Sequence, residues 1–256
     1  MIRFTTTLLG WILVLYSPAF VWAQLDKTMP DIRSITQTVD LSLATKGSLT
    51  TVALSINRLH GLGPSHRFSI GYGLRLTSAF GSTTDYRTAP ADLVKGKGKG
   101  SVIGLFSKDL EENIDTLRLP KTQGHSVNIS FNLDYAVSRR VDLGVNIDVI
   151  GFSFGPTQSG TFIANSPIRS SLSGTVQEAR LTTVNMLLGD KSDRGSLNSE
   201  GYVRCRLNPH CSLRGGLSFQ FNEYTTSRKL TLDNNRFRSS NTRVLLAVSY
   251  HFNARK

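Results

Sequence analysis

The stretch that most constrains this chain lies near its C-terminal end, at residues 241–252. Read at every second position, it carries one apolar row and one largely polar row. The apolar row consists of Val244, Leu246, Val248, Tyr250 and Phe252, and the polar row of Asn241, Arg243, Ala247, Ser249 and His251. Because successive side chains of a strand point to opposite faces, the pattern predicts a β-strand with one apolar and one polar face.

Seven more segments of this kind precede the last one. They are residues 35–45, 48–58, 67–80, 125–137, 141–154, 196–207 and 212–224. Each is close to the ~9 to 11 residues that a tilted strand needs to cross a bilayer. The alternation in 141–154 drifts near Gly151, which predicts a β-bulge or the exit from a membrane at that point.

The first hairpin has a two-residue turn at 46–47, a length that fixes the register of the two strands. Pairing Thr45 with Ser48 places Val39 opposite Leu54. The apolar faces then match, whereas a slip of one residue would move every side chain to the wrong face.

Loop lengths indicate the architecture. Connections after the second, fourth and sixth segments are short. Those after the third, fifth and seventh are long and cover residues 81–123, 155–195 and 225–240. Only the tight turn after the first segment departs from this alternation of short and long connections. Membrane barrels have short periplasmic turns and long outer loops. The sequence therefore predicts an all-β fold over residues 35–252, an eight-stranded antiparallel up-and-down transmembrane β-barrel. A soluble periplasmic β-protein is the alternative, but such a fold gives no reason for short connections at one end of the strands and long connections at the other.

The amino terminus has the features of a secretory signal. Residues 1–23 combine a positive start, a short apolar run and small residues before a cleavage point after Ala23. A retained membrane helix is the alternative, but Pro18 interrupts the run, which is shorter than the ~20 residues that a spanning helix needs. Residues 24–34 are then a periplasmic lead-in and 253–256 a C-terminal tail.

The formal net charge is +12 at pH 7. A secreted chain rarely meets nucleic acid, so we expect no nucleic-acid partner. The lipid bilayer and lipopolysaccharide phosphates are the more natural partners. Lys95, Lys97 and Lys99 alternate with glycine in the first long loop, which is either a flexible segment or an anion contact. It lacks the spacing of a nucleotide-binding Walker loop.

Three segments carry a resemblance to known proteins. They are Asn-Ile-Asp-Thr-Leu at 113–117, Val-Asn-Ile-Asp-Val-Ile-Gly-Phe-Ser-Phe-Gly at 145–155 and Gly-Ser-Leu-Asn-Ser-Glu at 195–200. With them, essentially the whole mature chain resembles the uncharacterised eight-stranded outer-membrane β-barrel proteins of the Bacteroidota. The resemblance implies the barrel fold and a location in the cell outer membrane. It transfers no functional residues.

The polar faces of the strands carry many charges. Sorting by face places Asp40, Arg67, Arg75, Asp134, Asp142, Asp148, Glu200, Arg204, Arg206, Arg214 and Arg243 inside the barrel. Eight strands enclose a space just wide enough for side chains to fill, and an unpaired buried charge is costly. We therefore expect an ion-pair network that fills the lumen. A narrow path for a solute or an ion is the alternative.

The two cysteines, Cys205 and Cys211, flank a turn at 208–209. A register centred on residue 208 places them directly opposite each other, which predicts a disulfide in an oxidising compartment; two free thiols are the alternative. Two cysteines without convergent histidines are too few ligands for a metal site. We expect no metal and no cofactor.

Residues 107–119 could form a short helix over the barrel mouth, with Leu110, Ile114 and Leu117 on one face. Catalysis is not expected. His125 and Ser126 are the one adjacent pair of the types used in acyl transfer, but neighbours in a strand point to opposite faces.

The leading hypothesis is a non-enzymatic outer-membrane barrel that binds an unknown extracellular ligand through its loops or supports membrane integrity. The alternatives are a channel for a small or hydrophobic compound and a membrane component of a secretion or assembly machine. Phe252 is predicted to be the terminal aromatic that the barrel-assembly machinery recognises.

Overall fold

The computed structural model describes residues 32–89, 91–94, 109–188 and 193–252. The predicted signal peptide, most of the lead-in, the tail and Lys95, Lys97 and Lys99 lie outside the described residues. The strands are β1 (Ile35–Lys46), β2 (Leu49–Leu62), β3 (Phe68–Gly81), β4 (Thr84–Thr88), β5 (Thr116–Leu119), β6 (Thr122–Ala136), β7 (Val141–Phe154), β8 (Gln158–Ile163), β9 (Val176–Leu181), β10 (Val184–Met186), β11 (Leu197–Arg206), β12 (Cys211–Thr226) and β13 (Arg236–His251). The helical elements are α2 (Ala91–Val94), η2 (Glu111–Asn113) and η3 (Pro167–Leu172). Among the described residues, no helix has the length and apolar character needed to span a membrane.

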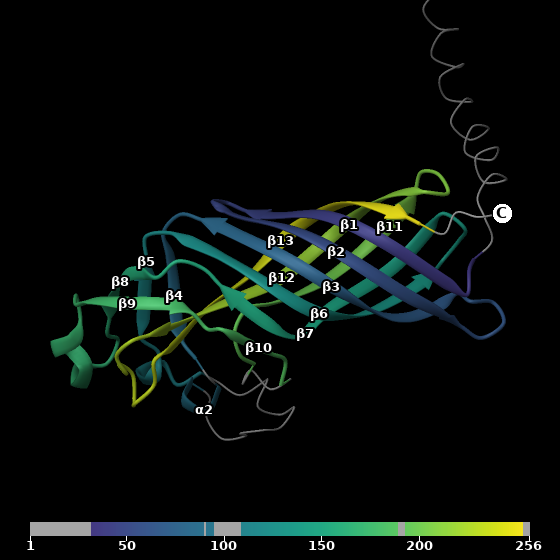
Figure 1. Cartoon of the computed structure of the whole chain (residues 1–256). Helices are drawn as coiled ribbons and strands as arrows, with labels where there is room; N and C mark the ends of the chain where they lie inside the picture. The colour runs from purple at the N-terminus through teal and green to yellow at the C-terminus, as the bar shows by residue number, and fades with distance from the viewer. Residues whose placement is uncertain (1–31, 90, 95–108, 189–192, 253–256) are drawn as a thin grey trace, which may run out of the picture.

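The eight longest strands form a closed antiparallel ring, which we call the barrel (Figure 1). Its order is β1, β2, β3, β6, β7, β11, β12 and β13, and β13 pairs back with β1. These strands correspond to the eight segments with alternating side chains. The predicted count is nevertheless too low, because the described chain forms a sheet of 13 strands.

Four of the additional strands build a second, smaller ring at one end of the barrel, which we call the outer ring (Figure 1). The pairings run from β13 through β4, β5, β8 and β9 to β12. Since β12 also pairs with β13 from Cys211 to Thr225, this ring closes as well. The fifth additional strand, β10, pairs with β7 at the barrel wall. The sequence placed all of these segments in the long connections, with β5 inside the short helix expected at 107–119.

The first hairpin has a register that differs from the predicted one by two positions. Thr45 pairs with Thr50, and Val39 lies opposite Ile56 rather than Leu54. The turn sits at 47–48, where Gly47 adopts a left-handed φ of 57°. A shift of two residues keeps every side chain on its predicted face, because the repeat of a strand is two.

The bulge predicted near Gly151 is confirmed. Along β6 and β7, Ile129 pairs with Ile150 but Ser130 pairs with Asp148, so Val149 is left out of the ladder. As a result, Val149 and Ile150 are both exposed on the outer face. A bulge of this kind inserts one unpaired residue and bends the strand.

Several predicted bounds differ from the structure: β2 runs to Leu62 rather than residue 58, and β6 begins at Thr122 rather than residue 125. The part of 107–119 that the structure describes contains η2 and β5 rather than one helix, because β5 pairs with β4 and β8 and buries Leu117. The last strand begins at Arg236 instead of residue 241, since it continues beyond the barrel and pairs with β12 as far as Thr225.

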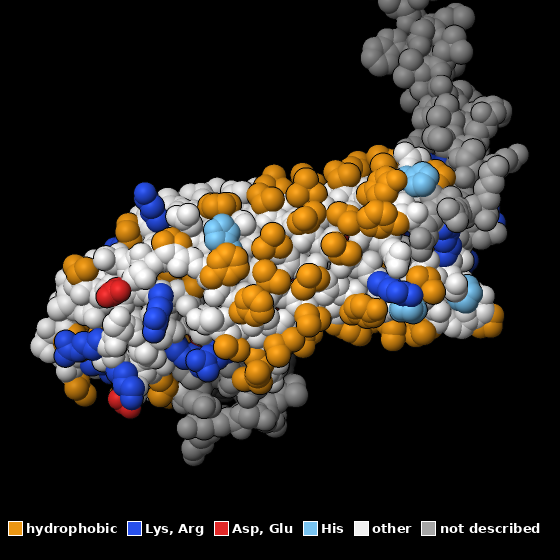
Figure 2. Space-filling model, in the orientation of Figure 1, with side chains coloured by type: hydrophobic (Ala, Val, Ile, Leu, Met, Phe, Trp, Pro, Cys, Tyr) orange, Lys and Arg blue, Asp and Glu red, His pale blue; other side chains and the backbone are white. Residues whose placement is uncertain are grey.

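The barrel has an apolar outside and a polar inside. On β13, the outward side chains of Val244, Leu246 and Val248 are 59%, 63% and 53% exposed, whereas the inward Arg243 and Ser249 are buried. The other barrel strands repeat this arrangement, and hydrophobic side chains cover the visible wall of the barrel in Figure 2. This is the reverse of a water-soluble β-protein.

Candidate functional site

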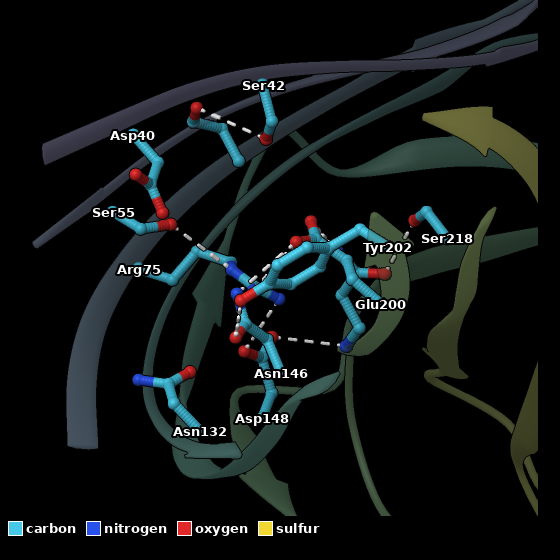
Figure 3. A network of polar contacts seen from close by, with 12 residues as sticks. Asp40, Ser42, Ser55, Arg75, Asn132, Asn146, Asp148, Glu200, Tyr202 and Ser218 are labelled. Atoms are coloured by element: carbon cyan, nitrogen blue, oxygen red, sulfur yellow. Dashed lines mark hydrogen bonds and ion pairs between the residues drawn. The ribbon is translucent and has the colours of Figure 1, made fainter. Parts of the chain in front are cut away.

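A network of buried charged side chains crosses the lumen of the barrel (Figure 3). Arg75 Nη1 lies 3.1 Å from Asp148 Oδ1, and Arg75 Nη2 lies 3.3 Å from Glu200 Oε2. Arg214 bridges Glu200, at 2.7 Å, and Asp40, at 2.5 Å. These five residues come from five different strands, so the ion pairs tie opposite walls of the barrel together.

A second group of charges lies closer to the end of the barrel away from the outer ring. Arg204 Nη1 is 2.5 Å from Asp134 Oδ2 and 3.4 Å from Asp142 Oδ2. Arg206 Nη2 is 2.9 Å from the same oxygen of Asp142. The two carboxylates are buried, and their guanidinium partners balance them.

Tyr202 connects the two groups. Its hydroxyl donates a hydrogen bond of 2.7 Å to Asp134 Oδ1 and accepts one of 3.1 Å from Arg204 Nη2. The guanidinium of Arg214 lies 3.7 Å from the centre of its ring, a cation–π contact. The charged lumen is thus one continuous network.

Most of the charged residues predicted to face inward take part in these ion pairs. They are Asp40, Arg75, Asp134, Asp142, Asp148, Glu200, Arg204, Arg206 and Arg214. The exception at the inner end is Arg67, which is exposed in the turn before β3 rather than lumenal.

Arg243 is buried in the lumen but forms no ion pair with any described carboxylate. Its Nη1 donates to Gln220 Oε1 at 2.5 Å and to Thr51 Oγ1. The prediction that Arg243 belongs to the ion-pair network is therefore wrong: its partners are a neutral amide and a hydroxyl, because β2 and β12 present no acid at this level.

Asparagine side chains complete the network, and the sequence interpretation passed over them. Asn57 Nδ2 donates to Asp40 Oδ2 at 2.8 Å, and Asn128 Nδ2 donates to Asp148 Oδ2 at 2.9 Å. Each lies on the polar row of its strand, as Tyr202 does. The alternation alone was sufficient to place them inside, although their partners were not predictable.

The outer ring encloses an apolar core. Its buried members are Tyr86, Leu117, Leu119, Phe162, Ala179, Leu181, Tyr224, Leu230 and Phe237. The rings of Tyr86 and Tyr224 pack edge to face with centres 5.0 Å apart, and those of Phe162 and Phe237 do so at 6.2 Å. The Tyr224 hydroxyl donates a hydrogen bond of 3.0 Å to the carbonyl oxygen of Gln123.

Asp115 fastens the far end of the outer ring. Its carboxylate is fully buried and lies 2.6 Å from Arg169 Nε in η3. It also accepts hydrogen bonds from Thr231 Oγ1 at 2.7 Å and from the backbone N–H of Asn165 at 2.9 Å. One carboxylate thus joins three segments that are far apart in the sequence.

Charged side chains cover the outside of the outer ring. Glu223 is buried beneath Arg236 and Arg238, at 2.8 and 2.9 Å. On the exposed face, hydrogen bonds from Arg118 lower the pKa of the Asp85 carboxyl, and the closest approach of the two side chains is 2.7 Å. The outer ring therefore has the polarity of an ordinary water-soluble fold.

The predicted disulfide between Cys205 and Cys211 is absent, and both cysteines are free. The hairpin is centred one position later than expected, so Cys205 lies opposite Leu213. Cys211 lies opposite Tyr250 on the neighbouring strand β13.

His125 and Ser126 point apart, as the strand geometry requires: Ser126 is buried in the lumen, and His125 lies on the outer face. His125 Nδ1 instead lies 2.9 Å from Ser78 Oγ, between the rings of Phe80 and Phe154. No group of three or more His, Cys, Asp or Glu residues in the described chain could hold a metal ion.

No protein-family model and no curated protein matches this sequence. Among solved structures, the chain is similar to a major outer membrane protein from Thermus thermophilus (15% identity, TM-score 0.34, covering 86% of this chain and 100% of that one). It is also similar to the Yersinia pestis outer membrane protein Ail, with 9% identity and a TM-score of 0.33 over 85% of this chain and 99% of that one. Neisserial surface protein A is 10% identical, with a TM-score of 0.32 over 85% of this chain and 96% of that one.

Proposed function

We propose that this protein is a non-enzymatic integral protein of the bacterial outer membrane, in which the eight barrel strands cross the bilayer. The observation that carries the proposal is the reversed polarity of the barrel, with charged side chains inside and apolar rows outside. In water, the apolar rows would be exposed at a large free-energy cost. In lipid, they are the surface that a membrane barrel presents.

A closed ring of strands also supplies hydrogen-bond partners for the backbone N–H and C=O groups of the barrel. Lipid offers no hydrogen-bond partners, so only helices and closed barrels span a membrane. The ring from β1 to β13 leaves no free edge. The turns that follow β2, β6 and β11, the start of β1 and the end of β13 then lie on the periplasmic side, and the outer ring lies outside the cell. The resemblance to barrels of the Bacteroidota and the role of Phe252 in assembly remain predictions.

Polar and charged side chains reach across the lumen of this barrel from opposite walls. Arginine, carboxylate, asparagine and tyrosine side chains occupy it, and a cavity near Asp134 and Arg204 has a volume of only about 20 Å³. That is room for about one water molecule. We therefore propose that the barrel does not conduct, and that it acts by holding the outer ring at the cell surface for binding or by supporting the membrane.

Two experiments test this proposal. Fractionation of cells should recover the mature chain in the outer membrane, and recovery in the soluble periplasm would contradict the location. Refolded protein in a planar bilayer should show no steady single-channel conductance. A steady conductance would reject the sealed lumen and favour a transport function.

A further inference from the structure

We propose that β10 and the two residues after it lie in the outer leaflet of the membrane, where lipid acyl chains contact them. The side chains concerned are those of Val184, Met186, Leu187 and Leu188, which we call the lip. β10 is not one of the eight barrel strands, and it pairs with the outer part of β7 (Figure 1). The inference rests on the proposed membrane location and adds a lipid-facing segment outside the eight spanning strands.

The lip is apolar and exposed. Val184, Met186, Leu187 and Leu188 are 46%, 38%, 36% and 54% exposed. A cluster of exposed apolar side chains marks a surface that a membrane or another molecule covers. The neighbours of the lip decide between these occupants.

The lip continues the apolar wall of the barrel. Val184 pairs with Phe152 and Met186 pairs with Ile150, so the two side chains of each pair lie on the same face. Phe152 and Ile150 are themselves 57% and 44% exposed on the outer face of the barrel. Acyl chains that contact this part of β7 would therefore also contact the lip, which favours lipid as the occupant.

The backbone of the lip has hydrogen-bond partners within the protein. The N–H of Leu187 donates to the carbonyl oxygen of Val149 at 2.8 Å, beside the bulge of β7. The N–H of Leu188 donates to the carboxylate of Asp193 at 2.7 Å. Hydrocarbon offers no partner to a backbone N–H, so a segment that lies in lipid needs partners of this kind.

Asn185 holds the lip against the barrel. Its side chain lies between the two outward residues of β10, is fully buried and faces the lumen. There Asn185 Oδ1 accepts a hydrogen bond of 2.9 Å from Ser153 Oγ, and Asn185 Nδ2 donates one of 2.7 Å to Asn128 Oδ1. The position of the lip on the outer wall is thus fixed by the same polar lumen that stabilises the barrel.

A polar border adjoins the lip. Asp193, whose carboxylate accepts the hydrogen bond from Leu188, also accepts hydrogen bonds through its carbonyl oxygen from the guanidinium groups of Arg236, at 3.0 Å, and Arg238. The same two arginines cover Glu223. Apolar side chains beside a cluster of charged groups match the passage from acyl chains to head groups at the surface of a bilayer.

Quenching of single tryptophans in vesicles tests the inference. Both native tryptophans lie in the predicted signal peptide, so Leu188→Trp reports the lip alone. We expect lipids brominated near the head group to remove most of its emission, and aqueous iodide to remove little. Ile168→Trp is the matched control: Ile168 is 90% exposed in η3, between two strands of the outer ring, and its tryptophan should be quenched by iodide alone.

Leu246→Trp, in the barrel wall, separates this inference from the proposed function. If brominated lipid quenches Leu246→Trp while iodide quenches Leu188→Trp, the lip lies in water and the inference is overturned, although the barrel crosses the membrane. Protection of Leu188→Trp from both quenchers would mean that a protein surface covers the lip, which also rejects lipid. If Leu188→Trp does not refold, Val184→Trp decides by the same readings. Quenching of Leu246→Trp by iodide would instead contradict the membrane location itself.

Discussion

The barrel and the outer ring share β12 and β13, yet they enclose opposite chemistry. Along β12, the inward side chain changes from Arg214 in the barrel to Tyr224 in the outer ring; along β13, it changes from Arg243 to Phe237. The face does not change, because each pair of positions is an even number of residues apart. The same pairing of β12 with β13 thus encloses polar side chains in one ring and apolar side chains in the other. Whether lipid or water surrounds a ring decides which side chains it encloses.

The change from polar to apolar inward side chains occurs over a few residues of each strand. Arg243, Gln220 and Thr51 form a polar group at the outer end of the lumen in which the arginine has neutral partners. Beyond it begins the aromatic core of the outer ring. We interpret this level as the boundary between the membrane-spanning barrel and the outer ring.

The largest effect should follow from breaking the charged lumen. In Glu200→Gln, the guanidinium groups of Arg75 and Arg214 lose the carboxylate that they share, and such a loss in a buried pair costs about 3–5 kcal/mol. We expect a large fall in the urea midpoint of the protein refolded in vesicles. Asp85→Asn, which removes an exposed ion pair, is the control and should leave the midpoint nearly unchanged. Equal midpoints for both variants would show that the network does not stabilise the barrel.

A substitution in the outer ring with a similar cost in stability should unfold only that ring. Phe162→Ala removes a fully buried ring from the apolar core, which costs about 3–5 kcal/mol. Because the barrel has its own network, we expect protease cleavage within β4, β5, β8 and β9 while the barrel stays inserted and protected. Loss of insertion together with the outer ring would mean that the two rings fold as one unit.

A charge on the outer wall should distinguish the surroundings of the two rings. Leu246→Arg places a cation in the middle of the apolar belt, where we expect a loss of about 2–4 kcal/mol in lipid. Val176→Arg places the same charge on the outer ring, at a side chain that is 70% exposed, and should be neutral. Unfolding in vesicles measures the loss of stability of both variants. An equal loss would mean that the barrel wall and the outer ring have the same surroundings.

The smallest effect is expected at the cysteines. Since Cys205 and Cys211 are free, a reducing agent should not change the unfolding midpoint. Alkylation of the denatured protein without reductant should add two labels by mass. Labelling only after reduction would show that Cys205 and Cys211 form the disulfide that the strand register excludes.

The barrel was predictable because its strands are long and face two different media. Segments such as 125–137 repeat the alternation often enough to fix both the strand and its inward face, and these determine which residues reach the lumen. Which inward residues would pair was not predictable. Arg75 contacts Asp148 and Glu200 on two other strands, and Arg243 meets an amide instead of a carboxylate.

The outer ring was missed for a related reason. Its four added strands are short, and β5 holds only Thr116–Leu119. Its pairings, such as β5 with β8 and β9 with β12, join distant segments, and Gly, Ser and Thr between them look like loops. Errors of register had unequal consequences. A shift of two residues in the first hairpin changed no face, whereas a shift of the same size at the cysteine turn, which pairs Cys205 with Leu213, removed a predicted bond.

Tryptophan fluorescence tests the contrast between the rings most directly. Both native tryptophans, Trp11 and Trp22, lie in the predicted signal peptide, so a single tryptophan introduced into the mature chain reports one site. In vesicles with brominated acyl chains, Leu246→Trp should be strongly quenched by the lipid and protected from aqueous iodide, whereas Val176→Trp should be quenched by iodide only. Quenching of Leu246→Trp by iodide as strongly as Val176→Trp would contradict a barrel that crosses the membrane.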